Sequence, residues 1–263
     1  MYPDLLKIGP FTLHSFGVMA MLGFLIPTLI MRRDFNRIKI DPDFASTIAV
    51  AAILGGFVGA RLYYIIEHWQ AFLRDPWSMI FSGAGLVWYG GLFGGVAAVV
   101  WTIRHYKMPF WKVADIVSIL LLLGQAFGRM GCLLAADGDY GPPSDVPWAM
   151  SFPDGVVPTN ERVHPTPLYD IAILLTFFGI LWSQRKRNFA PGTMFGMYFI
   201  AVSIGRFITE FWRTTPKILF GWISMAQIIS VILIATGLMI IYLRRRAQNR
   251  QVVSPATAKR QPA

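Results

Sequence analysis

Residues 113–135 read VADIVSILLLLGQAFGRMGCLLA and contain only two charged residues, Asp115 and Arg129. An apolar run of about 20 residues is long enough to cross a bilayer as one α-helix. Arg129 lies inside this run, where a charge is costly and is usually paired or retained for function. The stretch therefore predicts a membrane-spanning helix that carries a candidate site residue.

Six further apolar segments resemble this one in length and low charge. They cover residues 11–31, 44–66, 80–103, 165–183, 191–212 and 220–243. Charged residues make up only 14% of the 263-residue chain, and the mean hydropathy is +0.51. A soluble domain usually carries about 25% charged residues. We therefore predict an all-α polytopic membrane protein with about seven transmembrane helices.

Basic residues alternate between the connecting loops, and this alternation predicts the orientation. The loops after the first, third, fifth and seventh segments are basic, for example at Arg32, Arg104, Arg185 and Arg244. Basic loops face the cytoplasm, so the N-terminus is expected in the periplasm and the C-terminus in the cytoplasm. The net charge of +10 is held in these short clusters, as expected beside anionic lipid rather than for nucleic-acid binding.

The rest of the chain is predicted to be simply organised. We expect one transmembrane domain over residues 1–246, in which residues 136–164 form a periplasmic loop that either covers the site or is plain surface. The polar residues 247–263 are expected to be a disordered cytoplasmic tail. The first apolar segment lacks the features of a cleaved signal peptide and is expected to be retained. Cys132 is the only cysteine, so an internal disulfide is excluded.

Six ionisable residues fall within the predicted segments, and the orientation sorts them by depth. Asp115 lies near the cytoplasmic end and is expected to be structural. The other five are expected near the outer face, at the depth of phospholipid phosphates. They are His14, Arg61, Arg129, Arg206 and Glu210.

Helical spacing predicts one ion pair among these residues. Arg206 and Glu210 stand at i and i+4, so they can pair on one face of a helix. Arg129 has no acidic residue three or four positions away, and its partner must come from another helix, the long loop or a ligand. A planar guanidinium suits phosphate, so we favour substrate contact for Arg129.

Glycines are concentrated inside the predicted helices, at Gly55, Gly56 and Gly59 and again at residues 90–95. Small residues at this spacing let helices approach closely in lipid, and packing is their main expected role. Gly90, Gly91 and Gly131 also lie beside polar residues, where a lipid headgroup could approach the backbone.

Several short motifs, in order along nearly the whole chain, resemble those of bacterial phosphatidylglycerol–prolipoprotein diacylglyceryl transferases. They are LHSFG at 13–17, GFVGAR at 56–61, GGL at 90–92, GRMGC at 128–132, HPTPLYD at 164–170 and GRFITEF at 205–211. Each motif alone is weak, whereas their joint order is specific.

The resemblance implies a reaction and a place for it. Family members transfer the diacylglyceryl group of phosphatidylglycerol to the lipobox cysteine thiol of a prolipoprotein, which forms a thioether and releases glycerol phosphate. This is the first step of bacterial lipoprotein maturation. It implies a multi-pass protein of the inner membrane with its active site towards the periplasmic leaflet, and no cofactor or metal ion.

The resemblance also implies roles for the charged residues. Arg129 matches the phosphatidylglycerol-binding arginine, and Arg206 matches a second functional arginine with Glu210 as its acidic neighbour. Together with the residues singled out above, this gives Arg206, Glu210, His14 and Tyr89 as the expected catalytic residues, and Arg129, Arg61, Gly90, Gly91 and Gly131 as the expected lipid-binding residues.

Three positions depart from the family pattern. Tyr89 stands where a histidine is common, Phe16 where a tyrosine is common, and Cys132 where an asparagine is common. A phenol with an ordinary pKa of about 10 is a poor base at neutral pH, although its hydroxyl can bind a headgroup. His14 and His164 are candidate bases in place of the missing histidine, and the alternative for each of them is a structural role. Because the acceptor thiol comes from the substrate, Cys132 is expected to be a packing residue.

Two other classes of function fit the sequence less well than a transferase does. A transporter or channel would place polar groups throughout the membrane depth, whereas these residues gather on one side. An intramembrane hydrolase would need a nucleophile beside a histidine in a glycine-rich turn, and the sequence holds no such serine–histidine pair.

Overall fold

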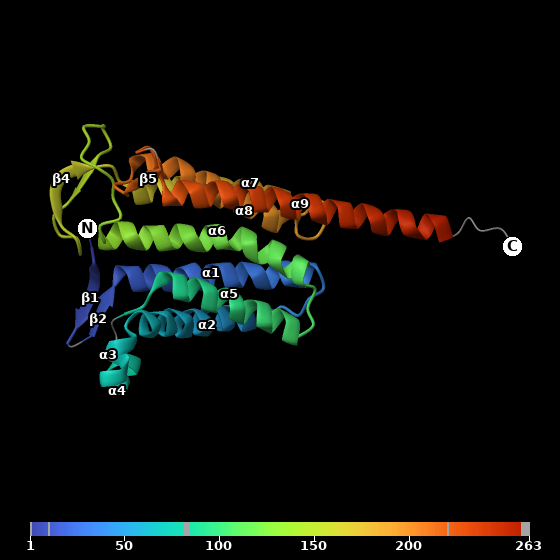
Figure 1. Cartoon of the computed structure of the whole chain (residues 1–263), viewed down its shortest axis with the longest axis horizontal. Helices are drawn as coiled ribbons and strands as arrows, with labels where there is room; N and C mark the ends of the chain where they lie inside the picture. The colour runs from blue at the N-terminus through green and yellow to red at the C-terminus, as the bar shows by residue number, and fades with distance from the viewer. Residues whose placement is uncertain (1, 10, 82–84, 220, 259–263) are drawn as a thin grey trace. The chain divides into compact units, whose positions relative to one another are not determined.

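The computed structural model describes residues 2–9, 11–81, 85–219 and 221–258, and most of them are helical (Figure 1). Six helices are long and apolar enough to cross a membrane, which confirms the polytopic helical class. They are α1 (Ser15–Arg37), α2 (Phe44–Glu67), α6 (Phe110–Ala135), α7 (Thr166–Gln184), α8 (Thr193–Thr209) with the 3₁₀ turn η1 (Glu210–Trp212), and α9 (Met225–Ala258).

The third predicted segment is not one continuous helix. Residue 80 belongs to the short helix α4 (Pro76–Phe81), which follows α3 (Trp69–Arg74), and α5 (Trp88–His105) begins eight residues later than predicted. Gly85 separates them with φ +85°, a backbone conformation that interrupts a helix and that glycine tolerates best. Helix α5 is not one of the six apolar helices, so the count of seven spans remains a prediction.

Two other helices begin later than predicted because antiparallel hairpins precede them. Strands β1 (Asp4–Ile8) and β2 (Phe11–His14) precede α1, and β5 (Lys217–Leu219) and β6 (Ile223–Ser224) precede α9. Gly9 and Gly221 take positive φ angles of 58° and 71° and allow the chain to reverse. In the first hairpin the register places His14 opposite Asp4.

The chain groups into two compact units, whereas the sequence predicts one domain over residues 1–246. The first unit contains Met1–Pro27 and Ala114–Ala263, and the second contains Thr28–Val113. Each is described below by itself.

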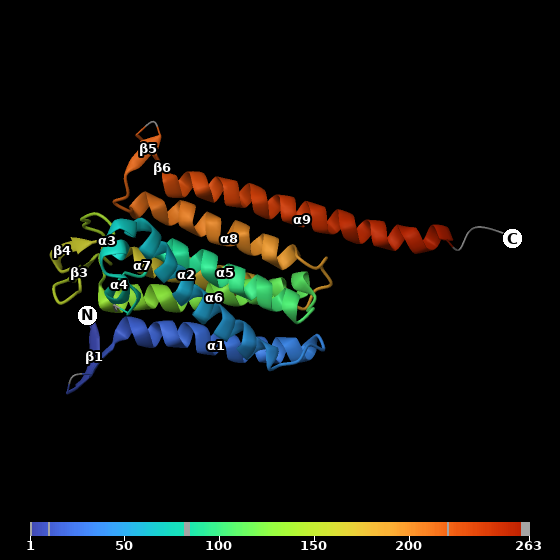
Figure 2. The same ribbon diagram turned by 60° about the horizontal axis from the view of Figure 1, so that its bottom comes forward.

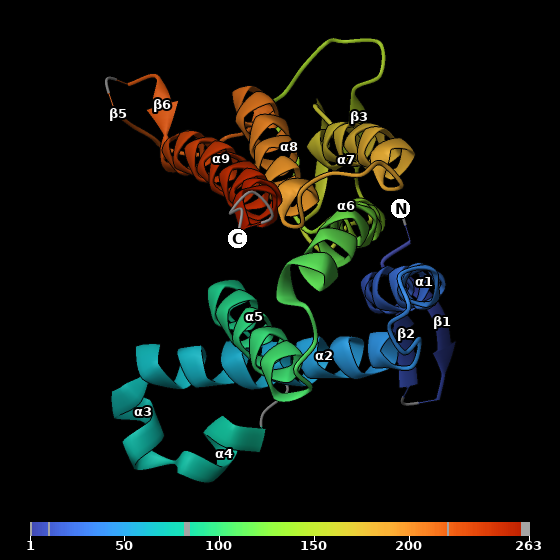
Figure 3. The same cartoon turned by 90° about the vertical axis from the view of Figure 1, so that its right-hand side faces the viewer.

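The core of the first unit is formed where α6, α7 and α8 meet. It is built from buried aliphatic side chains, namely Ile119, Leu122 and Ala126 of α6, Leu174 and Leu181 of α7, and Met194 of α8. Helix α9 packs along α8, as the views in Figures 2 and 3 both show.

Asp115 fixes the start of α8 from its place on α6. Its two carboxylate oxygens accept hydrogen bonds from the backbone nitrogens of Gly192 at 2.7 Å and Phe195 at 2.9 Å. Free backbone N–H groups at a helix N-terminus need such acceptors. The predicted structural role of Asp115 is confirmed.

Glycines of α6 allow a close approach to α1. A Cβ atom added at Gly124 would lie 2.9 Å from the carbonyl oxygen of Gly23, and one added at Gly131 would lie 3.0 Å from the ring of Phe16. The beginning of α1 therefore lies beside the end of α6, and His14 stands two residues before the phenylalanine that makes this contact.

The second unit is built around a glycine-lined contact between α2 and α5. A Cβ atom added at Gly94 would meet the carbonyl oxygen of Gly55 and would lie 2.7 Å from Cα of Gly59. Gly90 similarly faces the carbonyl oxygen of Gly59. The predicted use of these glycines for helix packing is confirmed.

We therefore expect Gly94→Ala to destabilise the protein by about 1–3 kcal/mol, the usual penalty for forcing extra volume into a packed contact. Thermal unfolding in detergent measures the change. Gly179→Ala is the matched control because nothing lies within 4 Å of its added Cβ, and it should be neutral or stabilising. Equal melting temperatures for the two variants would contradict the proposed close contact.

Helix α9 is longer than the predicted segment 220–243. It continues to Ala258, through most of the region that composition predicts to be a disordered tail, and residues 259–263 lie outside the described part of the chain.

Candidate functional site

Arg129, near the end of α6, finds its partners at a distance along the chain. Its Nη1 donates to the carboxylate of Asp139, in the loop after α6, and its Nε lies 3.2 Å from Oδ2 of Asp170, in the first turns of α7. Both the long loop and another helix thus supply a partner, as two of the three alternatives for this residue predict.

Arg213, just after η1, joins the same two carboxylates. It donates to both oxygens of Asp139 and, through Nη2, to Oδ2 of Asp170 at 2.7 Å. Its side chain is nearly buried. Hydrogen bonds between ionised partners are the strong ones, so Asp139 and Asp170 hold the two guanidinium groups side by side.

Arg206 and Glu210 complete the cluster. Nη2 of Arg206 lies 2.8 Å from Oε2 of Glu210, which confirms the predicted i,i+4 pair. The other Glu210 oxygen accepts from the hydroxyl of Thr215. Nη1 of Arg206 is buried and has no hydrogen-bond partner among the described residues, so it retains a donor. The Arg206 guanidinium is close enough to Arg213, Asp170 and Arg129 to interact with their charges, which places it in the same cluster.

The loop after α6 is an ordered support for Asp139. Strands β3 (Met150–Phe152) and β4 (Thr159–Val163) pair within it, and Tyr140 stacks on Phe152 with ring centroids 4.9 Å apart. The hydroxyl of Thr166 donates to the backbone carbonyl of Asp139 at 2.5 Å. The backbone of Asp139 is thereby fastened to the start of α7.

His14 forms a pair with Asp4 across the first hairpin. Its Nδ1 lies 2.8 Å from Oδ1 of Asp4, whose other oxygen binds Lys7 at 2.9 Å. Hydrogen bonds from Lys7 and His14 hold the pKa of Asp4 below its usual value. An ionised Asp4 accepts the Nδ1 proton, and the neutral imidazole then presents Nε2 as an acceptor.

His164 has a hydroxyl group as the partner of its Nδ1, where His14 has a carboxylate. Its Nδ1 lies 2.9 Å from the hydroxyl of Tyr169, and that hydroxyl accepts a hydrogen bond from the indole of Trp148 at 2.7 Å. The Tyr169 hydroxyl accepts from Trp148 and can either donate to Nδ1 of His164 or accept from it, since a hydroxyl has one proton and two acceptor lone pairs. These contacts tie the His164 ring to Tyr169 and Trp148, which favours a structural role.

The remaining predicted site residues belong to the second unit. Arg61 is buried, donates to the carbonyl of Gly85 at 3.3 Å and lies over the ring of Tyr64. Tyr89 is exposed at the start of α5. Gly90 and Gly91 pack against residues of α2. Gly131, which belongs to the first unit, packs against Phe16 and Met19 of α1. Headgroup contact by these glycines remains a prediction.

Cys132 is half-buried on α6, one turn after Gly128 and beside the carboxylate of Asp137. A reactive cysteine usually stands in an electropositive, accessible setting. This position favours the predicted packing role.

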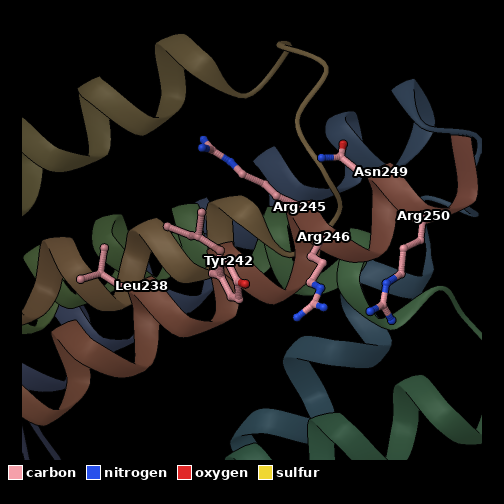
Figure 4. Close-up of a pocket in the computed structure, with 7 residues that line it drawn as sticks. Leu238, Tyr242, Arg245, Arg246, Asn249 and Arg250 are labelled. Atoms are coloured by element: carbon pink, nitrogen blue, oxygen red, sulfur yellow. The ribbon is translucent and has the colours of Figure 1, made fainter. Parts of the chain in front are cut away.

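A separate basic hollow of about 910 Å³ lies along the later turns of α9 (Figure 4). It is open and is lined from a single helix, chiefly by Tyr242, Arg245, Arg246 and Arg250. Arg244 of the same helix donates to the carbonyl of Pro191, just before the start of α8. The arginine–carboxylate cluster lies instead at the other end of α8, where Arg206 pairs with Glu210. We therefore place the candidate site at the cluster.

Sequence reasoning missed three members of the cluster. Arg213 stands three residues after Glu210 on the same predicted helix face, and this spacing is the signal that could have found it. Asp170 closes the HPTPLYD motif and carried no role. Asp139 has no sequence signal beyond an acidic residue in the long loop, since its contacts depend on how that loop folds.

Comparison with known proteins matches the sequence of this chain to one family. Residues 3–243 match the family model described as prolipoprotein diacylglyceryl transferase. Proteins named phosphatidylglycerol–prolipoprotein diacylglyceryl transferase are similar along most of their length. That of Trichormus variabilis is 30% identical, with 96% of this chain and 94% of the relative aligned. That of Synechococcus elongatus is 33% identical, with 90% of this chain and 85% of the relative aligned. That of Clostridium tetani is 31% identical, with 93% of this chain and 98% of the relative aligned. The chain belongs to the prolipoprotein diacylglyceryl transferase family.

Proposed function

We propose that this protein transfers the diacylglyceryl group of phosphatidylglycerol to the lipobox cysteine thiol of prolipoproteins. The observation that carries the proposal is the convergence of Arg129, Arg206 and Arg213 at one end of α6 and α8. The names of the relatives supply the two substrates. A transporter is disfavoured because the charged groups do not continue through the apolar core of α6, α7 and α8.

The reaction is a displacement at carbon. The thiolate sulfur attacks the glyceryl carbon that carries the phosphate ester, the carbon–sulfur bond forms, and the carbon–oxygen bond to phosphate breaks. The electron pair of that bond leaves with glycerol phosphate. Negative charge on the phosphate therefore grows during the step, and preorganised cationic donors lower the barrier most when they face that charge.

Arg129 and Arg206 are proposed phosphate ligands, together with Arg213, which shares its two carboxylate partners with Arg129. Arg129 is partly exposed, and Arg206 retains a buried donor without a partner in the described chain. Glu210 is fully buried beside Arg206 and fixes the orientation of its guanidinium. Arg61, Tyr89, Gly90, Gly91 and Gly131 remain proposed contacts of the lipid headgroup.

His14 is the proposed base that removes the thiol proton. Tyr89 occupies the usual histidine position, and His164 is tied to the Tyr169 hydroxyl, which also accepts from Trp148. His14 instead has a carboxylate on Nδ1 and an accepting Nε2. It also stands two residues before Phe16, which contacts Gly131, two residues beyond Arg129.

The membrane setting proposed for this chemistry is the outer face of the bacterial inner membrane. The six apolar helices support a multi-pass protein. The alternating basic loops support seven spans with the N-terminus in the periplasm and the tail in the cytoplasm. The phosphate of an outer-leaflet lipid then lies at the level of the cluster.

A reconstituted assay tests the function. Purified protein in phosphatidylglycerol vesicles is incubated with a lipobox peptide, and thioether-linked diacylglyceryl peptide and glycerol phosphate are quantified. We expect the two products in equal amounts and none with a serine in place of the peptide cysteine.

The matched control is Cys132→Ala, which should retain transfer because the acceptor sulfur belongs to the peptide. Loss of transfer in this variant, with folding intact, would instead favour a nucleophilic cysteine. If wild-type protein makes no product where another family member does, the proposed function is wrong.

A further inference from the structure

Asp139 bridges two guanidinium groups in the way that a phosphate would. One carboxylate oxygen binds Nη1 of Arg129 and lies 3.1 Å from Nη2 of Arg213, and the other binds Nη1 of Arg213. Two oxygens of a phosphate make the same bidentate contacts to arginine. The side chain therefore occupies the position between Arg129 and Arg213 where an anionic ligand would bind.

The ion pairs of the cluster balance without a ligand. Three arginines face three carboxylates, those of Asp139, Asp170 and Glu210. Lys217 adds a positive charge at the edge, where its Nζ lies 3.3 Å from the carbonyl oxygen of Glu210. A phosphate entering this largely paired set must compete with one of the carboxylates, because unpaired negative charges crowded at low dielectric repel each other strongly.

Burial identifies the carboxylate that can leave. The Glu210 side chain is 0% exposed and that of Asp170 is 9% exposed, whereas that of Asp139 is 25% exposed. Asp170 is also built into α7, while Asp139 lies in the loop. The backbone of Asp139 is held by Thr166, so its side chain can rotate away from the arginines without moving the loop.

We propose that Asp139 is a displaceable carboxylate that holds Arg129 and Arg213 in place until a phosphate arrives, and that its return helps to release the phosphate product. The proposal rests on the function proposed above, since it assigns the phosphate to the headgroup of the lipid substrate and then to glycerol phosphate. Asp139 thus competes with the phosphate for Arg129 and Arg213.

The test compares Asp139→Asn with Asp154→Asn in the full-length protein. Asp154 is an exposed carboxylate of the same loop, and no contact with an arginine is recorded for it within the described chain. Each variant therefore removes one negative charge from one loop. Asp139→Asn leaves Arg129 and Arg213 paired with Asp170, so the fold should persist, and thermal unfolding in detergent checks this.

Two ligands are measured separately. For Asp139→Asn we expect the KM for phosphatidylglycerol in vesicles, and the Kd of soluble glycerol phosphate from calorimetry, each to fall about tenfold, as for loss of a competing charged hydrogen bond. Asp154→Asn should change neither. Tighter lipid binding without tighter glycerol phosphate binding would confine the exchange to the lipid headgroup and contradict its role in product release.

Weaker or unchanged binding of both ligands by Asp139→Asn would overturn the proposal and make Asp139 a positioning residue. Because calorimetry needs no turnover, it reports on Asp139 even if wild-type protein forms no thioether. Absence of thioether product would therefore reject the proposed function, whereas the calorimetric result would still decide the role of Asp139.

Discussion

Replacing Arg129 by alanine is expected to lower the transfer rate by about 10²–10³-fold, the usual loss when one donor to a developing oxyanion is removed. The side chain is partly exposed beside Asp139 and Asp170, as a ligand-binding group must be. The measurement is initial-rate formation of thioether peptide in phosphatidylglycerol vesicles. The variant should still fold, because Arg213 continues to bind both carboxylates.

Two further variants make the result specific. Arg129→Lys keeps the charge but loses the planar pair of donors, so it should recover only part of the rate. Arg32→Ala removes an exposed arginine that pairs with Asp43 outside the cluster, and it should be fully active. Retained turnover in Arg129→Ala would remove this residue from the phosphate site.

Replacing His14 by glycine is expected to lower the rate by about 10²–10³-fold if the imidazole removes the thiol proton, within the range for general base catalysis. The imidazole is oriented by Asp4, which lies opposite it in the hairpin register. Asp4→Asn should therefore cause a smaller loss of kcat, because it removes the orienting carboxylate but leaves the base.

Chemical rescue separates this role from a structural one. Added imidazole should restore part of the activity of His14→Gly, whereas a packing defect would not respond. His68→Gly is the control, since this histidine lies at the end of α2, where its Nδ1 contacts the carbonyl of Tyr64. A rate unchanged in His14→Gly, or a loss that imidazole does not rescue, would count against His14 as the base.

The features predictable from sequence are those set by local physics. Apolar length defines the helices, and the spacing of Arg206 and Glu210 defines their ion pair because four residues make about one helical turn. The glycines of α2 and α5 were likewise recognisable as packing residues, since small side chains have few other uses within such apolar helices.

Helix starts were less predictable because apolar strands resemble apolar helices over a few residues. Residues 11–14 satisfy the composition of a membrane helix, yet they pair with β1 in a hairpin. A different cause applies near residue 80, which lies in the short helix α4, because Gly85 interrupts the chain before α5 begins.

By itself, then, the sequence determined the membrane class, the arginines within apolar helices and the ion pair between Arg206 and Glu210. Only the tertiary structure decided the partners of Arg129, the entry of Arg213 into the site and the place of Asp139 between them. The physical reason is that these contacts join α6, α7, the loop after α6 and the residue after η1 across gaps of 10 to 74 residues. Helical periodicity relates only residues a turn or two apart, whereas these pairs form when packing brings opposite charges together at low dielectric.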